Sequence, residues 1–156
     1  MAALMNANDA VYGSLAECYV TVGEERYNLM QLYEFESKYE VHLTEVPVLG
    51  RVSKGKKPAG GEGSWSGRAH YNQSVFRKWI LHYKNTGELT PFDIQVTNED
   101  PSSKAGRQTV IHKGCLIDQV ILAKYAAGDD ILDEEISGTF DDWEMPESFD
   151  LLDGMQ

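Results

Sequence analysis

A mainly β fold with a single α-helix is predicted by three features of the 156-residue sequence. Several stretches alternate apolar and polar residues, which is typical of half-buried strands. One stretch, residues 74–86, repeats its apolar residues at three and four positions, as an amphipathic helix does. Residues 108–125 are apolar on both faces, as a strand covered from both sides is. The length fits one domain over residues 1–156.

The first predicted strand is residues 15–22, where small apolar residues alternate with others until Gly23 ends the run. Residues 29–49 alternate over a longer distance, with aromatic and aliphatic side chains on one face. The opposite face carries Glu34, Glu36, Lys38 and Glu40. A helix over residues 27–39 also fits the apolar spacing, but aromatic enrichment and steady alternation favour a strand.

This second strand is long enough to project beyond the body of a domain. At about 3.3 Å per residue it spans roughly 50 to 70 Å, against the usual strand of about 17 to 20 Å. It leads into residues 50–63, which are rich in Gly and Lys and are expected to form a flexible loop. Residues 64–71 alternate again and complete a long projecting hairpin.

Residues 74–86 form the predicted helix. Ser74 suits its N-cap, and Gly87 suits the stop at its C-terminal end. The apolar side of this helix should cover a sheet, and it consists of Val75, Phe76, Trp79, Ile80 and Tyr83.

The last third of the chain supplies the remaining strands. Residues 91–97 form one strand, residues 108–125 another with a bulge at Gly114, and residues 136–143 the last. The two-faced strand 108–125 needs a second cover, and an adjacent subunit is a natural one. The expected subunit-interface residues are Ile117, Val120, Ile121 and Leu122. Residues 145–156 are expected to form an acidic tail.

The charge is unevenly distributed. The chain has 25 acidic and 14 basic residues, a net charge of −11, and residues 126–156 contain no Lys or Arg. The main basic cluster lies in the predicted loop and consists of Arg51, Lys54, Lys56 and Lys57. Nucleic-acid affinity comes largely from a broad basic surface, so an acidic chain with one basic loop is not expected to bind DNA as its function.

No motif in the sequence predicts catalysis or a cofactor. Gly50 to Lys56 nearly matches a phosphate-binding loop, but Lys57 replaces the required Ser or Thr and Pro58 follows where a helix should start. The acidic run 129–135 lacks the residue order of a calcium loop. We therefore expect no enzyme activity and no cofactor, while a nucleotide-dependent enzyme that uses the Gly50 loop is kept as a distant alternative.

The histidines and cysteines show no metal-site spacing. His42, His70, His82 and His112 are scattered and are expected to be exposed, whereas the isolated Cys18 and Cys115 are expected to be buried thiols. No metal is expected. The longest aliphatic stretch, residues 120–123, is far too short to cross a membrane, so we expect synthesis in the cytoplasm and no membrane insertion.

Taken together, several segments resemble the phage tail tube protein family, that is, the PBSX-like inner tail tubes of contractile phage tails and phage-tail-like bacteriocins. The resemblance runs from about Leu15 to Phe149. Its strongest local signals are Val-Thr-Asn-Glu-Asp-Pro at 96–101 and Phe-Asp-Asp-Trp at 140–143, and the helix 75–87 and the segments 45–51 and 63–67 also carry it.

The resemblance implies a two-sheet β-sandwich or barrel with one flanking helix. It further implies that six copies form a ring and that rings stack into a hollow tube inside a contractile sheath. The implied partners are other copies of the chain, the sheath, the tape-measure protein and the baseplate hub, with DNA only as transported cargo. The implied location is the tail of a virion or of a phage-tail-like particle.

Two hypotheses follow for particular residues of such a tube. The face with Glu34, Glu36, Lys38 and Glu40 suits a watery lumen, and the basic loop suits a salt-sensitive contact with the acidic C-terminal region of another subunit. A monomeric β-sandwich that binds a ligand at Trp65, Tyr71 and the loop 50–63 is the main alternative. The sequence does not separate an infectious phage from a bacteriocin or a secretion-type tube.

Overall fold

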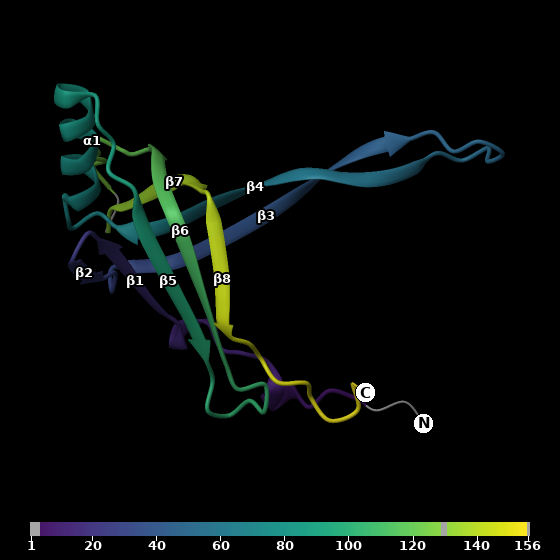
Figure 1. Ribbon diagram of the computed structural model, residues 1–156. Coiled ribbons are helices and arrows are strands. Elements are labelled where there is room, and N and C mark those ends of the chain that lie inside the picture. The colour runs from purple at the N-terminus through teal and green to yellow at the C-terminus, as the bar shows by residue number, and fades with distance from the viewer. Residues whose placement is uncertain (1–3, 129–130, 156) are drawn as a thin grey trace.

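The computed structural model describes residues 4–128 and 131–155. Within these residues the chain forms one antiparallel sheet of eight strands with one α-helix (Figure 1). The strands are β1 (Glu17–Val22), β2 (Glu25–Asn28), β3 (Leu32–Val46), β4 (Gly55–His70), β5 (Phe92–Glu99), β6 (Arg107–Gln119), β7 (Asp133–Phe140) and β8 (Asp142–Glu147). Helix α1 spans Val75–Thr86, and two short 3-10 turns, Ala7–Asp9 and Gly13–Leu15, precede β1.

Strand β6 joins the two halves of the sheet. The strand order is β2-β1-β5-β6-β7-β4-β3, and β8 lies beside β6 as well. Residues 107–115 of β6 pair with β5, whereas residues 116–119 pair with β7. Because one strand belongs to both halves, the sheet is continuous and curls over on itself, where two separate sheets were expected.

The sheet bends at a bulge in β6. Between the pairs Phe92–Cys115 and Ile94–His112, β6 has two residues where β5 has one. Gly114 occupies this point with φ +65°, a left-handed conformation that L side chains rarely adopt. The predicted bulge at Gly114 is therefore confirmed. Across from it, the amide of Asp141 donates to the carbonyl of Lys113 at 3.0 Å, where β7 gives way to β8.

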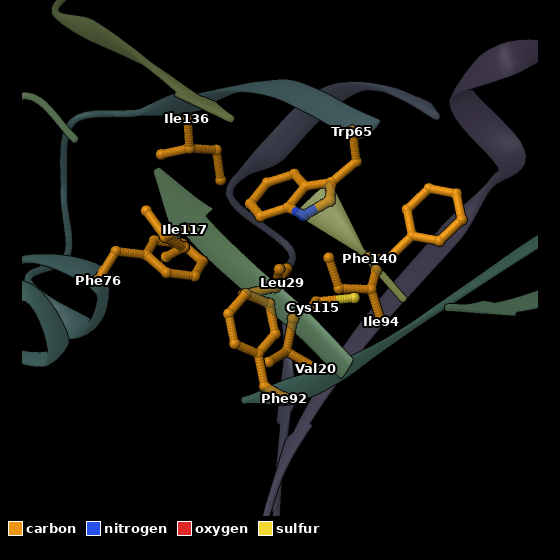
Figure 2. Close-up of a cluster of buried hydrophobic side chains, with 10 residues drawn as sticks. All are labelled: Val20, Leu29, Trp65, Phe76, Phe92, Ile94, Cys115, Ile117, Ile136 and Phe140. Carbon is orange, nitrogen blue, oxygen red and sulfur yellow. The ribbon is translucent and has the colours of Figure 1, made fainter. Parts of the chain in front are cut away.

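The core lies between the two halves of the curled sheet. Trp65 of β4 meets Phe92 of β5 edge-on, with ring centroids 6.0 Å apart, although β4 and β5 are not neighbours in the sheet. Figure 2 shows the buried apolar side chains of this core, which are Val20, Leu29, Trp65, Phe76, Phe92, Ile94, Cys115, Ile117, Ile136 and Phe140. Side chains of alternate residues enter it, as the period of a strand dictates.

Helix α1 covers one end of this core, as predicted. Phe76 is buried, and the ring of Trp79 lies 5.1 Å from that of Phe92. The helix ends at Gly87 in the left-handed conformation, φ +78°. At its start the side chain of Ser74 makes no capping hydrogen bond, and the Gln73 side chain accepts from the amide of Val75 at 2.7 Å instead.

Strands β3 and β4 form an arm that projects from the body (Figure 1). The 15 residues of β3 span about 50 Å at the usual rise, which confirms the long projecting hairpin. The expected loop over residues 50–63 is shorter in the structure, because β4 already begins at Gly55. The Gly-rich part of β4 is held as a strand by its pairing with β3, which continues to Val46 and Gly55.

The other boundaries differ from the prediction in four places. The strand expected over 108–125 ends at Gln119, and the strand expected over 136–143 is two strands, β7 and β8. The short β2, which pairs with β1 through the turn at Gly23, was not predicted. The tail expected over 145–156 starts later, because β8 runs to Glu147. The last residue of the expected tail, residue 156, lies outside the described part of the chain. No helix among the described residues is long and apolar enough to span a membrane.

Candidate functional site: a polar sheet face and a projecting arm

One face of the sheet is polar along three neighbouring strands. Glu34, Glu36, Lys38 and Glu40 are all exposed on β3, as the alternation predicted. Their register partners on β4 are Arg68, Ser66, Ser64 and Glu62. Beyond β4, strand β7 adds Glu135, Ser137 and Thr139, which pair with Arg68, Ser66 and Ser64. We call these eleven residues the polar face.

The polar face is acidic and lacks large apolar side chains. It contains five carboxylates and two cations, a net charge of −3. The opposite side of the same strands carries the buried Trp65, Ala69 and Ile136. The core thus occupies one side of these strands, and the other side is left to water.

Arg68 organises the charges at one end of the polar face. Its guanidinium lies 2.6 Å from Glu135, 3.5 Å from Asp133 and 4.0 Å from Glu34. The hydroxyl of Tyr33 donates to Asp133 at 2.8 Å, which lowers the pKa of Asp133, and Lys124 lowers it further. The same hydrogen bond raises the pKa of Tyr33. Both pKa values move away from 7, so neither group is placed to exchange protons near pH 7.

The four predicted basic loop residues lie together at the end of the arm. Arg51, Lys54, Lys56 and Lys57 are exposed, and Lys54 lies 3.8 Å from Glu45. The loop at Gly50 leads into strand β4 and not into a helix, so it lacks the helix N-terminus that a phosphate-binding loop uses. The nucleotide-dependent alternative therefore has no structural support.

The inner side of the arm is an exposed apolar strip. Tyr39, Val41 and Leu43 continue the core-facing side of β3 away from the core and are about half exposed. The ring of Tyr39 still lies 6.1 Å from that of Trp143 in β8, whereas Val41 and Leu43 lie farther along the arm. The ring of Tyr39 lies over Gly61, where a Cβ atom would come within 2.6 Å of its hydroxyl. At the tip, Leu49 and Val52 are fully exposed.

The four predicted subunit-interface residues differ in their burial. Ile117 is 3% exposed and belongs to the core of its own chain, so the expectation of a free apolar face is wrong for this residue. Val120 and Ile121 follow the end of β6 and are half-buried, whereas Leu122 is 70% exposed. Leu122 alone of the four presents a largely free side chain.

His112 is buried, contrary to the expectation that every histidine is exposed. Its Nδ1 lies 3.0 Å from the carbonyl of Ile94 and its Nε2 lies 2.8 Å from the hydroxyl of Ser37. A carbonyl only accepts, so Nδ1 carries the proton and Nε2 accepts from Ser37. Burial lowers the pKa of His112. Burial also raises the pKa of Cys18 and of Cys115 to about 12, which keeps both thiols protonated.

The contribution of β4 and β7 to the polar face was not predicted from the sequence. Glu62, Arg68 and Glu135 join it only through the register of β3 with β4 and of β4 with β7. The alternation of residues 62–70 was the available signal for β4. Among the described residues, no group of three or more His, Cys, Asp or Glu side chains is arranged to hold a metal ion.

The chain matches one protein family model and is similar in sequence to two Bacillus subtilis proteins. A family model described as phage tail tube protein matches residues 3–147. The phage-like element PBSX protein XkdM of Bacillus subtilis (strain 168) is 26% identical over 143 residues, which cover 92% of this chain and 95% of the relative. An uncharacterized protein of the same organism, YqbM, matches with the same identity and coverage.

The fold is similar to that of solved components of contractile particles. A chain in the baseplate of the anti-feeding prophage superposes with a TM-score of 0.66 at 9% identity, covering 87% of this chain and 95% of that chain. A chain in the sheath–tube complex of the PVC extracellular contractile injection system gives a TM-score of 0.61 at 16% identity, covering 84% and 88%. At these identities the superpositions establish the shared fold.

Proposed function

The chain belongs to the phage tail tube protein family, and from this premise we propose that six copies join into a ring and that rings stack into a hollow tube. As a tail tube subunit it is a structural component of a phage or phage-like tail particle, and not an enzyme. We further propose that the polar face lines the lumen of the tube and that the arm reaches an adjacent subunit or ring.

The observation that carries the lumen proposal is the contrast between the two sides of β3, β4 and β7. The apolar side is covered by the core of the chain itself, while the other side holds the charged and hydroxyl side chains of the polar face. A water-filled conduit needs such a surface. The net charge of −3 on the polar face also repels a phosphate backbone, which favours sliding over binding.

Free strand edges and exposed apolar groups support assembly with other copies. The outer edges of β2 and β3 end the strand order, and such edges are aggregation hazards unless another strand or segment covers them. Pairing between copies would cover these edges and close the curled sheets into a barrel-like ring. The apolar strip of the arm and Leu122 would gain cover in the same way.

The external partners follow from the family and remain part of the proposal. A contractile sheath would surround the tube, a tape-measure protein would occupy it during assembly, and a baseplate hub would start it. DNA would pass through as cargo in an infectious particle, and the proposed location is the virion tail or its counterpart in a phage-tail-like particle. The named sheath–tube and baseplate structures that share the fold support the sheath and the baseplate as partners.

The alternative of a monomeric ligand-binding module loses Trp65 from its proposed site. Trp65 is 3% exposed, and its indole Nε1 donates to the carbonyl of Thr139 at 3.2 Å. A side chain so placed is a core residue and offers no surface to a sugar or peptide.

Electron microscopy of the purified chain across concentration, with light scattering for mass, tests the proposed function. Rings of six subunits and hollow tubes are the expected result. Preformed tube fragments added as seeds should lower the concentration at which tubes grow. A chain that stays monomeric at high concentration, with and without seeds, would contradict ring formation and stacking.

A further inference from the structure

We propose that the basic tip of the arm, residues 47–57, binds the acidic segment of a second copy, residues 141–155. This inference rests on the proposed function, because it names the surface that receives the arm of a tube subunit. The two surfaces are complementary in charge, and each also exposes apolar side chains.

The basic tip has no acidic residue and little internal pairing. It contains four cations, and among the described residues only Lys54 has a carboxylate within 4 Å, that of Glu45 at 3.8 Å. All its residues except Gly55 are exposed, including the fully exposed Leu49 and Val52. The tip therefore presents a net charge of +4 beside two uncovered aliphatic side chains.

The acidic segment has the opposite composition. It contains six carboxylates and no Lys or Arg. Two of them are paired within the chain, Glu144 with Lys113 at 2.7 Å and Glu147 with Arg107 at 3.4 Å. Among the described residues, the other four have no ion-pair partner, and they are Asp141, Asp142, Asp150 and Asp153.

The acidic segment also offers apolar contact in a fixed place. Leu151 and Met155 are exposed beside Asp150 and Asp153. The amide of Asp150 donates to the carbonyl of Ala105 at 2.6 Å, which holds the segment against the loop between β5 and β6. In the proposed contact, four unpaired carboxylates and exposed apolar side chains such as Leu151 and Met155 would meet four cations and the exposed Leu49 and Val52.

The contact joins two copies because a single copy cannot make it. Figure 1 shows the tip at the far end of the arm, away from β8 and the chain that follows β8. Since the two surfaces differ, the contact is head-to-tail, and such a contact repeats from copy to copy without pairing off into dimers. That property is what the growth of a stacked tube requires.

Charge reversal and charge exchange test the contact. The variant Lys56→Glu/Lys57→Glu reverses the tip, Asp150→Lys/Asp153→Lys reverses the segment, and a fourfold variant combines them. At low salt each reversal should slow seeded elongation by about ten-fold or more, the lower end of the range for electrostatic steering. The fourfold variant should recover most of the rate. Lys78→Glu/Lys84→Glu, on exposed positions of α1, is the matched control and should elongate normally.

Cross-linking measures the contact directly. Chains with Val52→Cys and chains with Leu151→Cys, treated with a short bismaleimide, should form cross-linked pairs when mixed and far fewer at high salt. The parent chain reports any background from Cys18 and Cys115. Tubes that grow normally with reversed tips and give no cross-link would overturn the contact and leave the proposed function standing. If the parent chain does not assemble and the two cysteine variants do not cross-link, both the contact and the proposed function are overturned.

Discussion

Arg77 of α1 and Glu134 of β7 form an ion pair whose carboxylate is almost completely buried, at 1% exposure. Gln73 donates to the same carboxylate at 2.8 Å, and Arg77 also donates to the carbonyl of Ile121 at 3.1 Å. The guanidinium lies 4.5 Å from the ring centre of Tyr71. The pair therefore ties the helix both to β7 and to the segment that follows β6.

Removing one partner of this pair should destabilise the fold strongly. The variant Arg77→Ala leaves a buried carboxylate without its cation, which typically costs about 3 to 5 kcal/mol. Urea denaturation measures the free energy of unfolding. The control is Arg68→Ala, because Arg68 contacts three carboxylates but is half exposed, and exposed pairs contribute about 0 to 1 kcal/mol. Equal losses in the two variants would contradict this account of the pair.

Acid should weaken the fold through His112. Burial lowers the pKa of the folded ring below its ordinary value of 6.5, and its neighbours are the Ile94 carbonyl, the Ser37 hydroxyl and the rings of Phe35 and Phe140. Between pH 6.5 and the lowered pKa of the folded ring, the unfolded ring therefore binds a proton that the folded ring does not. The free energy of unfolding should fall as the pH drops through this window and should show no contribution from His112 above it.

Denaturation of the parent and of His112→Gln at a series of pH values from 7.5 to 5 isolates this contribution, because the amide does not titrate. The variant should lose less stability than the parent over that interval. His82→Gln is the control, since His82 is exposed on α1. Parallel pH profiles for the parent and His112→Gln would show that the ring titrates normally in the fold.

Gly138 should not tolerate a side chain. A Cβ atom there would lie 1.8 Å from the carbonyl oxygen of Leu116 and 2.9 Å from the Trp65 ring. Since the nearest atom is backbone in a paired strand, Gly138→Ala should destabilise the chain by about 3 kcal/mol or more, at or beyond the usual range for overpacking. Gly13→Ala meets nothing within 4 Å and serves as the control in the same thermal denaturation. A variant Gly138→Ala as stable as the control would show that β6 and β7 are not this close.

The elements that the sequence predicted well have local signals. Helix α1 has its apolar spacing and Gly87 within one segment, and β3 alternates apolar and polar residues over most of its length, with Ser37 as an exception. The start of β4 was missed because Gly, Lys and Pro are poor strand formers by themselves. Pairing with β3 overrides that preference, and a bulge opposite residues 41–43 accommodates Gly60 with φ +105°.

The features that the sequence did not predict depend on distant partners. His112 reads as an exposed strand residue, yet Phe35, Ser37 and Phe140 enclose it from other strands. The Arg77–Glu134 pair joins residues 57 positions apart. Likewise, Ile117 is in the core because β6 ends its pairing with β5 at Cys115 and turns to β7. Such contacts follow from the curl of the sheet, and no local pattern encodes them.

The projecting part of the arm, residues 41–58, should contribute to assembly without contributing to folding. Leu43 is more than half exposed on the apolar strip, so Leu43→Ser should change the free energy of unfolding by less than about 0.5 kcal/mol. If an adjacent copy covers the strip, the same variant should raise the concentration needed for tube growth. Light scattering of assembly and urea denaturation of the dispersed chain measure the two effects. Leu81→Ser, on an exposed position of α1, is the control, and equal assembly defects in both variants would contradict a specific role of the arm.

The polar face should become inaccessible to large molecules when the tube forms. Ser64 is exposed at the centre of this face, between Lys38 and Thr139 in the register. In the dispersed chain, Ser64→Cys should react with both a small maleimide and a maleimide carried on a large protein. In tubes the small reagent should still react, because the lumen is open to water, whereas the large one should not.

Lys78→Cys, exposed on α1, is the control for a site outside the lumen and should react with both reagents in both states. Equal shielding of the two cysteines would mean that packing between copies, and not a lumen, protects Ser64. Full reaction of Ser64→Cys with the large reagent in tubes would place the polar face on the outside.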